Sequence, residues 1–269
     1  MAAFPDSMVD SITPASDAAF LATIAAELGV ADNAAVQRES FTQWVLERFD
    51  MADGPDLAAA GVTITGDVRG YEQAKLRILN GAHSTLAYTG LALEHETVFE
   101  AMSDAALAGF VTRLVHQDIA ASLAPVEGLD TAAYADAVLD RFRNPAIRHL
   151  LAQIAWDGSQ KLPYRLLDTV ADALDAGRSV ARLAVPVAAW IAFLRRKALG
   201  GETITDPLAD VLAAAASGGD PVARCSRSGR YFPSGWCRMR ASQAPSAMRS
   251  MPSPGKDRDA SRALSRLEM

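Results

Sequence analysis

The sequence predicts a mainly α, multi-helix domain with a minor β element. Over residues 1–223, apolar side chains recur with a helical period in segments rich in alanine and leucine. Apolar residues make up 50% of the 269-residue chain, which is enough to fill one sizeable core. Only two short stretches are rich in β-branched or aromatic residues, so strands should contribute little to the fold.

The expected elements follow from this periodicity and from the residues that interrupt it. Prolines at 125, 145, 163 and 207 indicate boundaries, because proline lacks the backbone N–H that a helix interior uses. Asp130, Asp157 and Asp206 stand where the chain is expected to turn or to begin a helix. Helices are predicted over residues 16–28, 73–93, 97–120, 131–142, 145–156, 163–176 and 181–198, and strands over 41–46 and 61–65.

A K-x4-N-x2-H motif, formed by Lys75, Asn80 and His83, opens the second helical segment. At about 100° per residue, Lys75, His83 and Asn80 fall at roughly 0°, 80° and 140° around a helix, so they share one face. Desolvation can remove the charge of a lysine in such a place and let it accept a proton near neutral pH. The same spacing also arises by chance on solvated helix faces, so the motif alone does not define a site.

Four blocks of sequence place the motif in a wider pattern. The segment KLRILNGAHSTLAYTG at 75–90 follows FPDSMVD at 4–10 and precedes RFRNP at 141–145 and QIAWDGSQKLP at 153–163. Together, over roughly residues 4–215, they resemble the polyol-specific long-chain dehydrogenases, or mannitol dehydrogenase family, whose branches include fructuronate reductase.

This resemblance implies the substrate-binding and catalytic C-terminal domain of a two-domain, NAD-linked enzyme. Such an enzyme interconverts a secondary alcohol of a sugar derivative and the corresponding ketone, without a metal. By the family's pattern, Lys75 is the general acid/base, Asn80 polarises the reacting oxygen and His83 binds a neighbouring hydroxyl. Asp10 and Lys161 match positions that line the family's substrate site.

Gln153 favours the sugar-acid branch, because mannitol-type members of the family tend to carry arginine at this position. A carboxylate-bearing substrate would need a cation nearby, which Lys161 or Arg148 would supply. Fructuronate, tagaturonate, mannitol and mannitol 1-phosphate all stay open as substrates.

The nucleotide-binding half of such an enzyme is expected to be missing. A Rossmann domain opens with a strand, a glycine-rich turn and a helix, and no G-x-G-x-x-G occurs before Lys75. We therefore expect the N-terminal Rossmann domain to be absent, residues 1–30 to be a remnant of the interdomain region and residues 31–220 to form the helical domain. The alternative is a non-catalytic remnant or interaction module that retains the helical fold.

The composition changes abruptly at Arg224. From there to Met269 the chain has nine arginines and nine serines but no valine or isoleucine, which predicts disorder for residues 221–269. A nucleic-acid-binding arm is disfavoured, because no binding module accompanies it, and translation out of frame would produce the same change. Cys225 and Cys237 lack a second pair and a supporting histidine, so neither a zinc site nor a disulfide framework is indicated.

Membrane and metal sites are not expected either. The longest apolar stretch, Leu183 to Leu194, is too short to span a bilayer, and the N-terminus lacks the basic start of a secretory signal. His95-Glu96 does not continue as H-E-x-x-H, because Phe99 occupies the second histidine position. We expect a cytoplasmic protein whose partner is a small sugar acid or polyol.

Overall fold

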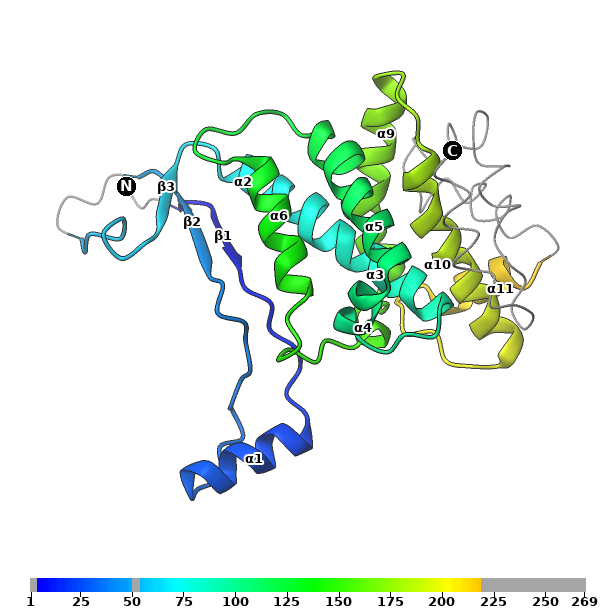
Figure 1. Cartoon of the computed structure of the whole chain (residues 1–269), viewed down its shortest axis with the longest axis horizontal. Helices are drawn as coiled ribbons and strands as arrows, with labels where there is room; N and C mark the ends of the chain where they lie inside the picture. The colour runs from blue at the N-terminus through cyan, green and yellow to red at the C-terminus, as the bar shows by residue number, and fades with distance from the viewer. Residues whose placement is uncertain (1–3, 50–53, 219–269) are drawn as a thin grey trace.

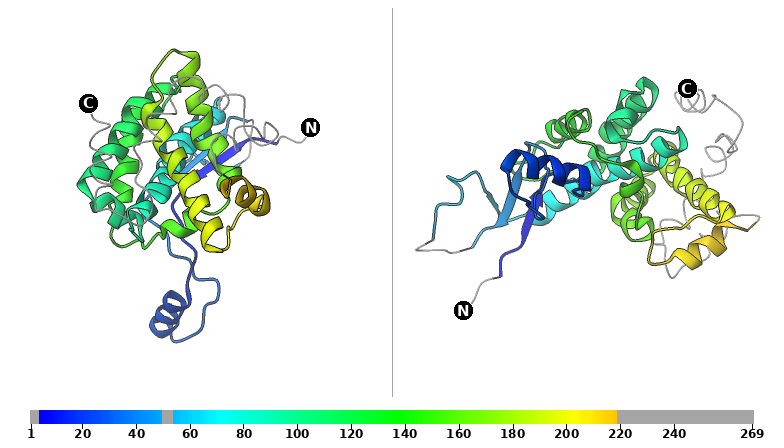
Figure 2. Two further views of the ribbon diagram at one scale, coloured as in Figure 1. Left: turned by 90° about the vertical axis from the view of Figure 1, so that its right-hand side faces the viewer. Right: turned by 90° about the horizontal axis from the view of Figure 1, so that it is seen from below.

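The structure is a computed structural model that describes residues 4–49 and 54–218. A helical body is joined at one end to a small sheet (Figure 1). Seen from below, this sheet and the first helix lie towards one end of the molecule and the last two helices towards the other (Figure 2, right).

The sheet has the strand order β1-β2-β3, with β1 (Ser7–Asp10) at one edge. β1 pairs antiparallel with β2 (Gln43–Glu47), and β2 pairs parallel with β3 (Thr63–Thr65). β2 and β3 overlap the two predicted strands, whereas β1 was not predicted, since four residues are too few to establish a period of two.

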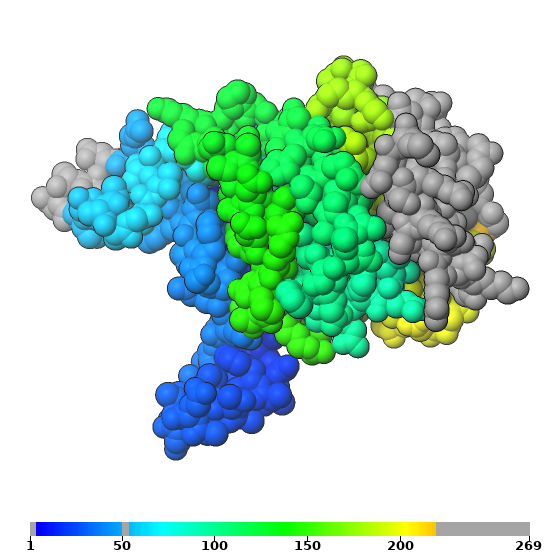
Figure 3. All heavy atoms as spheres, viewed as in Figure 1, coloured from blue at the N-terminus to red at the C-terminus, as the bar shows by residue number. Residues whose placement is uncertain are grey.

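The predicted helix at 16–28 is present as α1 (Ala18–Leu28). The Asp17 side chain accepts a hydrogen bond from the Phe20 N–H at 2.8 Å, and Gly29 ends the helix at φ 69°, a conformation that favours glycine. No residue of α1 is buried, and the space-filling view shows it as a protrusion from the body (Figure 3).

The predicted helix at 73–93 forms the centre of the body and is longer than expected. It consists of α2 (Val68–Ala74), the π-helical segment η1 (Lys75–Leu79) and α3 (Asn80–Ala92). All residues from Gly81 to Gly90 are buried, so α3 has no solvated face, as expected for a helix surrounded by other elements.

The predicted helix at 97–120 is divided at Asp104. α4 (Val98–Ser103) starts with a capping box between Thr97 and Glu100, and Asp104 then caps α5 (Ala105–Arg113) through the N–H groups of Ala106 and Leu107. The π-helical η2 (Leu114–Ile119) and the 3₁₀ turn η3 (Ala120–Ser122) follow. α6 (Thr131–Phe142) agrees with the prediction at both ends, and Asp130 caps it.

The predicted helix at 145–156 is largely wrong, because only α7 (Leu151–Ile154) is helical there. The residues before it are a turn followed by irregular backbone, and the extended Leu150 forms a bridge with Thr97. The boundary expected at Pro163 is also wrong: α8 (Gly158–Leu162), the π-helical η4 (Pro163–Leu167) and α9 (Asp168–Asp175) are continuous. Pro163 removes one α-helical hydrogen bond, and the chain continues with the wider π turn.

The predicted helix at 181–198 is confirmed as α10 (Ala181–Gly200), which packs along α3 and α11 (Ala209–Ala216). The core between these helices contains fully buried side chains such as Trp190, Tyr88 and Leu86. Across the residues that the structure describes, no helix is long and apolar enough to cross a membrane. The tail predicted at 221–269 lies outside the described residues.

Candidate active site

One pocket of about 270 Å³ lies between the end of β1, the η1–α3 junction, the segment before α7 and the α8–η4 helix. The six residues singled out in the sequence all line it: Asp10, Lys75, Asn80, His83, Gln153 and Lys161. Residues separated by up to 151 positions therefore meet in one place, although their chemical roles stay predictions.

The π turn of η1 changes the predicted geometry of the K-x4-N-x2-H motif. The backbone N–H of Asn80 donates to the carbonyl of Lys75, five residues earlier, instead of following the α-helical ladder. One turn of a π-helix thus separates Lys75 from Asn80, so the offset of about 140° calculated for an α-helix is wrong. The wider turn brings the lysine and the asparagine to the same side of the helix.

Lys75 also contacts the sheet. Its Nζ donates a hydrogen bond to the backbone carbonyl of Val9 in β1. This contact restrains the amine at the mouth formed by β1 and η1, and it leaves two of the three ammonium hydrogens for other partners.

His83 is 6% exposed and held by rings on two sides. It stacks on Phe142 with 4.4 Å between ring centroids and meets the edge of His149 at 5.0 Å. Burial lowers the pKa of His83 well below 6.5, and the neighbouring His149, Arg165 and Arg141 act in the same direction. The ring is therefore neutral at pH 7, and its buried Nε2 has no hydrogen-bond partner among the residues that the structure describes. A buried atom of this kind in a pocket wall is suited to a ligand hydroxyl.

His149 lines the same pocket, although it was not among the residues singled out in the sequence. Burial, and secondarily the charge of Lys161, lowers the pKa of His149 to about 4. Its buried Nδ1 also lacks a hydrogen-bond partner within the described ranges, 4–49 and 54–218. No sequence signal pointed to it, because it lies on the non-helical segment that was predicted to be helix.

Two cationic side chains of one continuous helix line the pocket. Lys161 is in α8 and Arg165 is four residues later in η4, close to one helical turn, so both can point to the same side. Burial, and then the charge of Arg165, lowers the pKa of Lys161, while Asp157 and Asp206 oppose this shift. Arg165 was not predicted, although its spacing from Lys161 could have indicated it.

Arg148, which the sequence offered as an alternative to Lys161 for binding a carboxylate, does not line the pocket. Its exposed side chain pairs with Glu96 at 3.3 Å.

Asp10 is 1% exposed, and its carboxylate is already bound by other side chains. Arg141 donates to both of its oxygens, at 2.9 and 2.8 Å, and the Tyr134 hydroxyl donates at 2.7 Å. Arg141 also binds Glu39, and these two carboxylates raise its pKa despite its burial. This arrangement fixes the end of β1 against α6, beside the pocket.

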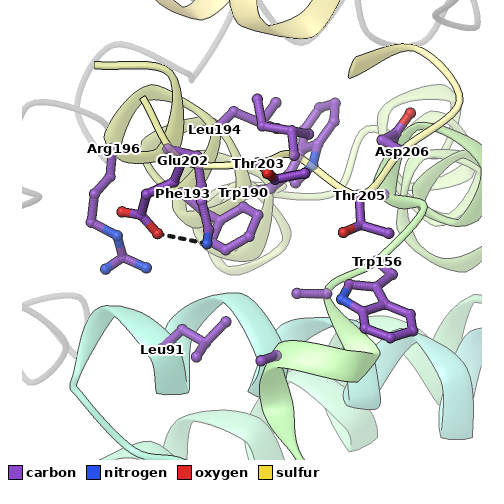
Figure 4. Close-up of a pocket in the computed structure, with 15 residues that line it drawn as sticks. Leu91, Trp156, Trp190, Phe193, Leu194, Arg196, Glu202, Thr203, Thr205 and Asp206 are labelled. Carbon is purple, nitrogen blue, oxygen red and sulfur yellow. Dashed lines mark hydrogen bonds and ion pairs between the residues drawn. The ribbon is translucent and has the colours of Figure 1, made fainter. Parts of the chain in front are cut away.

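A second pocket, of about 330 Å³, lies on the other side of α8, with walls from α3, α7, α10 and residues 202–206 (Figure 4). It contains none of the six predicted residues, and its ion pair joins Lys197 to Glu202 at 2.7 Å. Asp206 in its wall accepts hydrogen bonds from the N–H and the hydroxyl of Ser159, at 2.8 and 2.6 Å. The first turn of α8, which leads to Lys161, is therefore held from this side.

The comparison with family models identifies the class of protein. Residues 67–224 match the mannitol dehydrogenase C-terminal domain, and residues 1–58 match the mannitol dehydrogenase Rossmann domain. The chain belongs to the mannitol dehydrogenase family. The expected absence of a Rossmann domain is therefore wrong in part: the G-x-G-x-x-G turn belongs to the first β-α unit of such a domain and says nothing about its other strands and helices.

Individual relatives agree with this assignment. D-mannonate oxidoreductase of Escherichia coli is 43% identical over 71% of this chain and 39% of its own length. Mannitol 2-dehydrogenase of Pyrenophora tritici-repentis is 34% identical over 82% of this chain and 40% of its own length. The solved mannitol 2-dehydrogenase of Pseudomonas fluorescens, in complex with NAD and D-mannitol, has a TM-score of 0.85 at 30% identity, over 98% of this chain and 54% of that one. The chain thus spans about half the length of these relatives, or less.

Proposed function

We propose that this chain carries the alcohol-binding half of an NAD-dependent dehydrogenase that acts on a secondary alcohol of a sugar acid or polyol. The observation that supports this most directly is the convergence of Lys75, Asn80 and His83 in one pocket of a mannitol dehydrogenase family member. A substrate of the D-mannonate and D-fructuronate type is favoured by Gln153 and by the relative at 43% identity. Mannitol and mannitol 1-phosphate, with the corresponding fructose derivatives, are the alternatives.

The proposed chemistry needs three groups around the reacting carbon. Lys75 accepts the proton of the alcohol during oxidation and returns it to the oxygen during ketone reduction. The Asn80 side-chain amide donates to the same oxygen and stabilises the negative charge that develops on it. His83, which is neutral, hydrogen-bonds an adjacent hydroxyl through its unpartnered Nε2 and so sets the orientation of the sugar.

NAD would supply the hydride acceptor. The dinucleotide-binding turn G-x-G-x-x-G does not occur in the 269 residues, so we assign no NAD contact to any residue of this chain. The described residues orient the alcohol and move its proton, and the hydride step depends on groups that they do not include.

The test is NADH oxidation with D-fructuronate and with fructose. It should be measured for the chain alone and for the chain with residues 1–58 replaced by the complete Rossmann domain of a relative. In whichever form is active, Lys75→Ala should lower kcat about 10²- to 10⁴-fold, because it removes the general acid/base. Lys197→Ala is the matched control, since that lysine pairs with Glu202 outside the pocket.

The outcomes separate the candidate functions. Activity that survives Lys75→Ala undiminished would contradict the role of this lysine. If neither form oxidises NADH with either substrate, the alternative function, a non-catalytic module that keeps the helical fold, is favoured.

A further inference from the structure

The charges that line the pocket are unbalanced. Lys75, Lys161 and Arg165 all reach it, whereas the carboxylate in its wall, Asp10, shares the single charge of Arg141 with Glu39, which leaves one negative charge beside the pocket. The two pocket histidines contribute no negative charge. Within the described part of the chain, the pocket therefore has an excess of positive charge.

Arg165 differs from three other partly or fully buried arginines. Arg77 pairs with Asp172 at 2.6 Å, Arg182 with Asp118 at 2.5 Å, and Arg141 with Asp10 and Glu39 at 2.8 and 2.7 Å. Arg165 instead donates to the neutral Ser84 hydroxyl at 3.1 Å, and no carboxylate pairs with it among residues 4–49 and 54–218. Because a guanidinium stays charged at physiological pH, its burial without an anion is unfavourable.

We propose that Arg165, assisted by Lys161, binds an anionic terminal group, carboxylate or phosphate, of the sugar substrate and thereby determines substrate choice. This rests on the proposed function, because it assigns a recognition element to the same pocket. The planar guanidinium can give an oxyanion two parallel hydrogen bonds, and Lys161, four residues away on the same helix, adds a third donor.

The backbone around Arg165 is fixed independently of its side chain. A Cβ on Gly81 would lie 2.7 Å from the Arg165 carbonyl oxygen, so only glycine at 81 lets η4 come this close to α3. The backbone position from which the Arg165 side chain extends is therefore defined by packing of η4 against the helix that carries Asn80 and His83. A side-chain substitution at 165 changes the donor without changing this contact.

The experiment compares ligands that differ in their terminal group. D-mannonate, D-mannitol 1-phosphate and D-mannitol are titrated into the chain, and binding is followed by calorimetry and by the imidazole NMR signals of His83 and His149. An anion near these rings should raise their depressed pKa values, so the signals report charge in the pocket as well as occupancy.

Wild type should prefer one of the anionic ligands over D-mannitol. Arg165→Met should weaken binding of that ligand about 10- to 100-fold and leave D-mannitol within a few-fold, because only the charge-assisted hydrogen bonds are lost. Lys161→Met should have a smaller effect of the same kind. Arg148→Met is the matched control, since this exposed arginine pairs with Glu96 outside the pocket, and it should behave as wild type.

Each result decides something different. A preference for D-mannonate identifies a carboxylate as the bound group, and a preference for D-mannitol 1-phosphate identifies a phosphate. If the preference for an anionic ligand persists in Arg165→Met, or if D-mannitol binds as tightly as both anions, the proposal is overturned while the proposed function stands. If none of the three binds, both fail together. Circular dichroism of the variants excludes unfolding as the cause.

Discussion

At the scale of single residues, burial keeps the pocket histidines neutral, and neighbouring cations act in the same direction. His83 is buried and His149 half-buried, and the charges of Arg165 and Arg141 on His83 and of Lys161 on His149 further oppose protonation. Two neutral imidazoles with unpartnered nitrogens can exchange hydrogen bonds with sugar hydroxyls, whereas protonated rings would add charge to a site that is already positive.

These depressed pKa values predict that stability falls as the solution becomes acidic. The pKa of His149 is about 4 in the folded state against an ordinary value of 6.5, so between these values the unfolded chain binds the proton that the folded one excludes. Its contribution is complete above pH 6.5 and is lost as the pH falls towards 4. Urea denaturation at pH 7.5 and pH 5.0 should show that His149→Phe reduces the acid-induced loss by about 1–2 kcal/mol.

His83 has a pKa shift of the same sign, so the variant should retain part of the pH dependence. An equal loss of stability between pH 7.5 and pH 5.0 in wild type and His149→Phe would show that this histidine is not buried in its neutral form.

The sequence predicted the pocket residues that lie within a recognisable sequence block. It did not predict the pocket residues that only the folding of the chain brings there. Lys75, Asn80 and His83 lie within one helical segment, and Lys161 lies in a block that resembles a known family. His149 stands on a segment whose apolar pattern mimics a helix, and Arg165 is a common residue type in a common context. They reach the pocket only through the packing of elements that are far apart in the chain, which the folded structure reveals.

At the scale of elements, the pocket depends on two π-helical segments, η1 and η4, that pack against each other. η4 begins at Pro163, which gives a physical reason for its altered hydrogen-bond ladder. η1 contains neither proline nor glycine, and we have no physical account of why it widens at Lys75. Hydrophobic periodicity does not distinguish a π turn within a long helix, so sequence reasoning found the helix but calculated the offset between Lys75 and Asn80 for an α-helix.

The close approach of η4 to α3 predicts the effect of Gly81→Ala. The new Cβ would lie 2.7 Å from the carbonyl oxygen of Arg165, a backbone atom that cannot move alone. We expect a loss of about 1–3 kcal/mol in the free energy of unfolding, measured by urea denaturation.

Gly109→Ala in α5 is the control, because its Cβ would meet only the Arg113 side chain, at 3.5 Å. That change should be neutral or stabilising by up to about 1 kcal/mol. Similar effects of the two substitutions would argue against the close contact.

The attachment of α8 to residues 203–206 predicts a role for Asp206 in positioning Lys161. Asp157, at the start of α8, has φ 56° and provides no side-chain cap, so Asp206 binds the Ser159 N–H instead. Asp206→Ala should lower the free energy of unfolding by about 1–2 kcal/mol, as for the loss of a helix cap. Amide hydrogen exchange should also become faster at residues 159–161.

The control is Asp210→Ala, an exposed change in the first turn of α11, which should leave both measurements unaltered. Unchanged exchange in Asp206→Ala would mean that α8 is held by its packing alone.

At the scale of the whole molecule, the pocket forms where the part that matches a Rossmann domain meets the helical domain. Asp10 and the Val9 carbonyl come from the first part, and Lys75, His83 and Lys161 come from the second. Sequence periodicity predicted most helices of the second part, although not the one expected at 145–156, because their apolar residues recur with the helical period and pack in a common core. It could not predict how the two parts join, since that junction is made by a few polar residues far apart in the chain.

Arg141 is the centre of that junction, and its removal should separate the two parts. Its guanidinium, 7% exposed, binds Asp10 and Glu39 of the first part from α6 of the second. Arg141→Met leaves two buried carboxylates without a partner, so we expect a loss of about 3–5 kcal/mol in the free energy of unfolding and faster proteolysis between residues 10 and 67. Arg143→Met, whose exposed partner is Asp140, should cost less than about 1 kcal/mol.

The triple variant Asp10→Asn, Glu39→Gln, Arg141→Met separates charge from packing. If uncompensated charge causes the loss, neutralising both carboxylates should restore much of the stability that Arg141→Met removes, because the desolvation of the anions is then no longer required. If the triple variant is no more stable than Arg141→Met, the guanidinium acts through its packing on Phe41, which it covers at 4.1 Å, and the ion pairs contribute little to the junction.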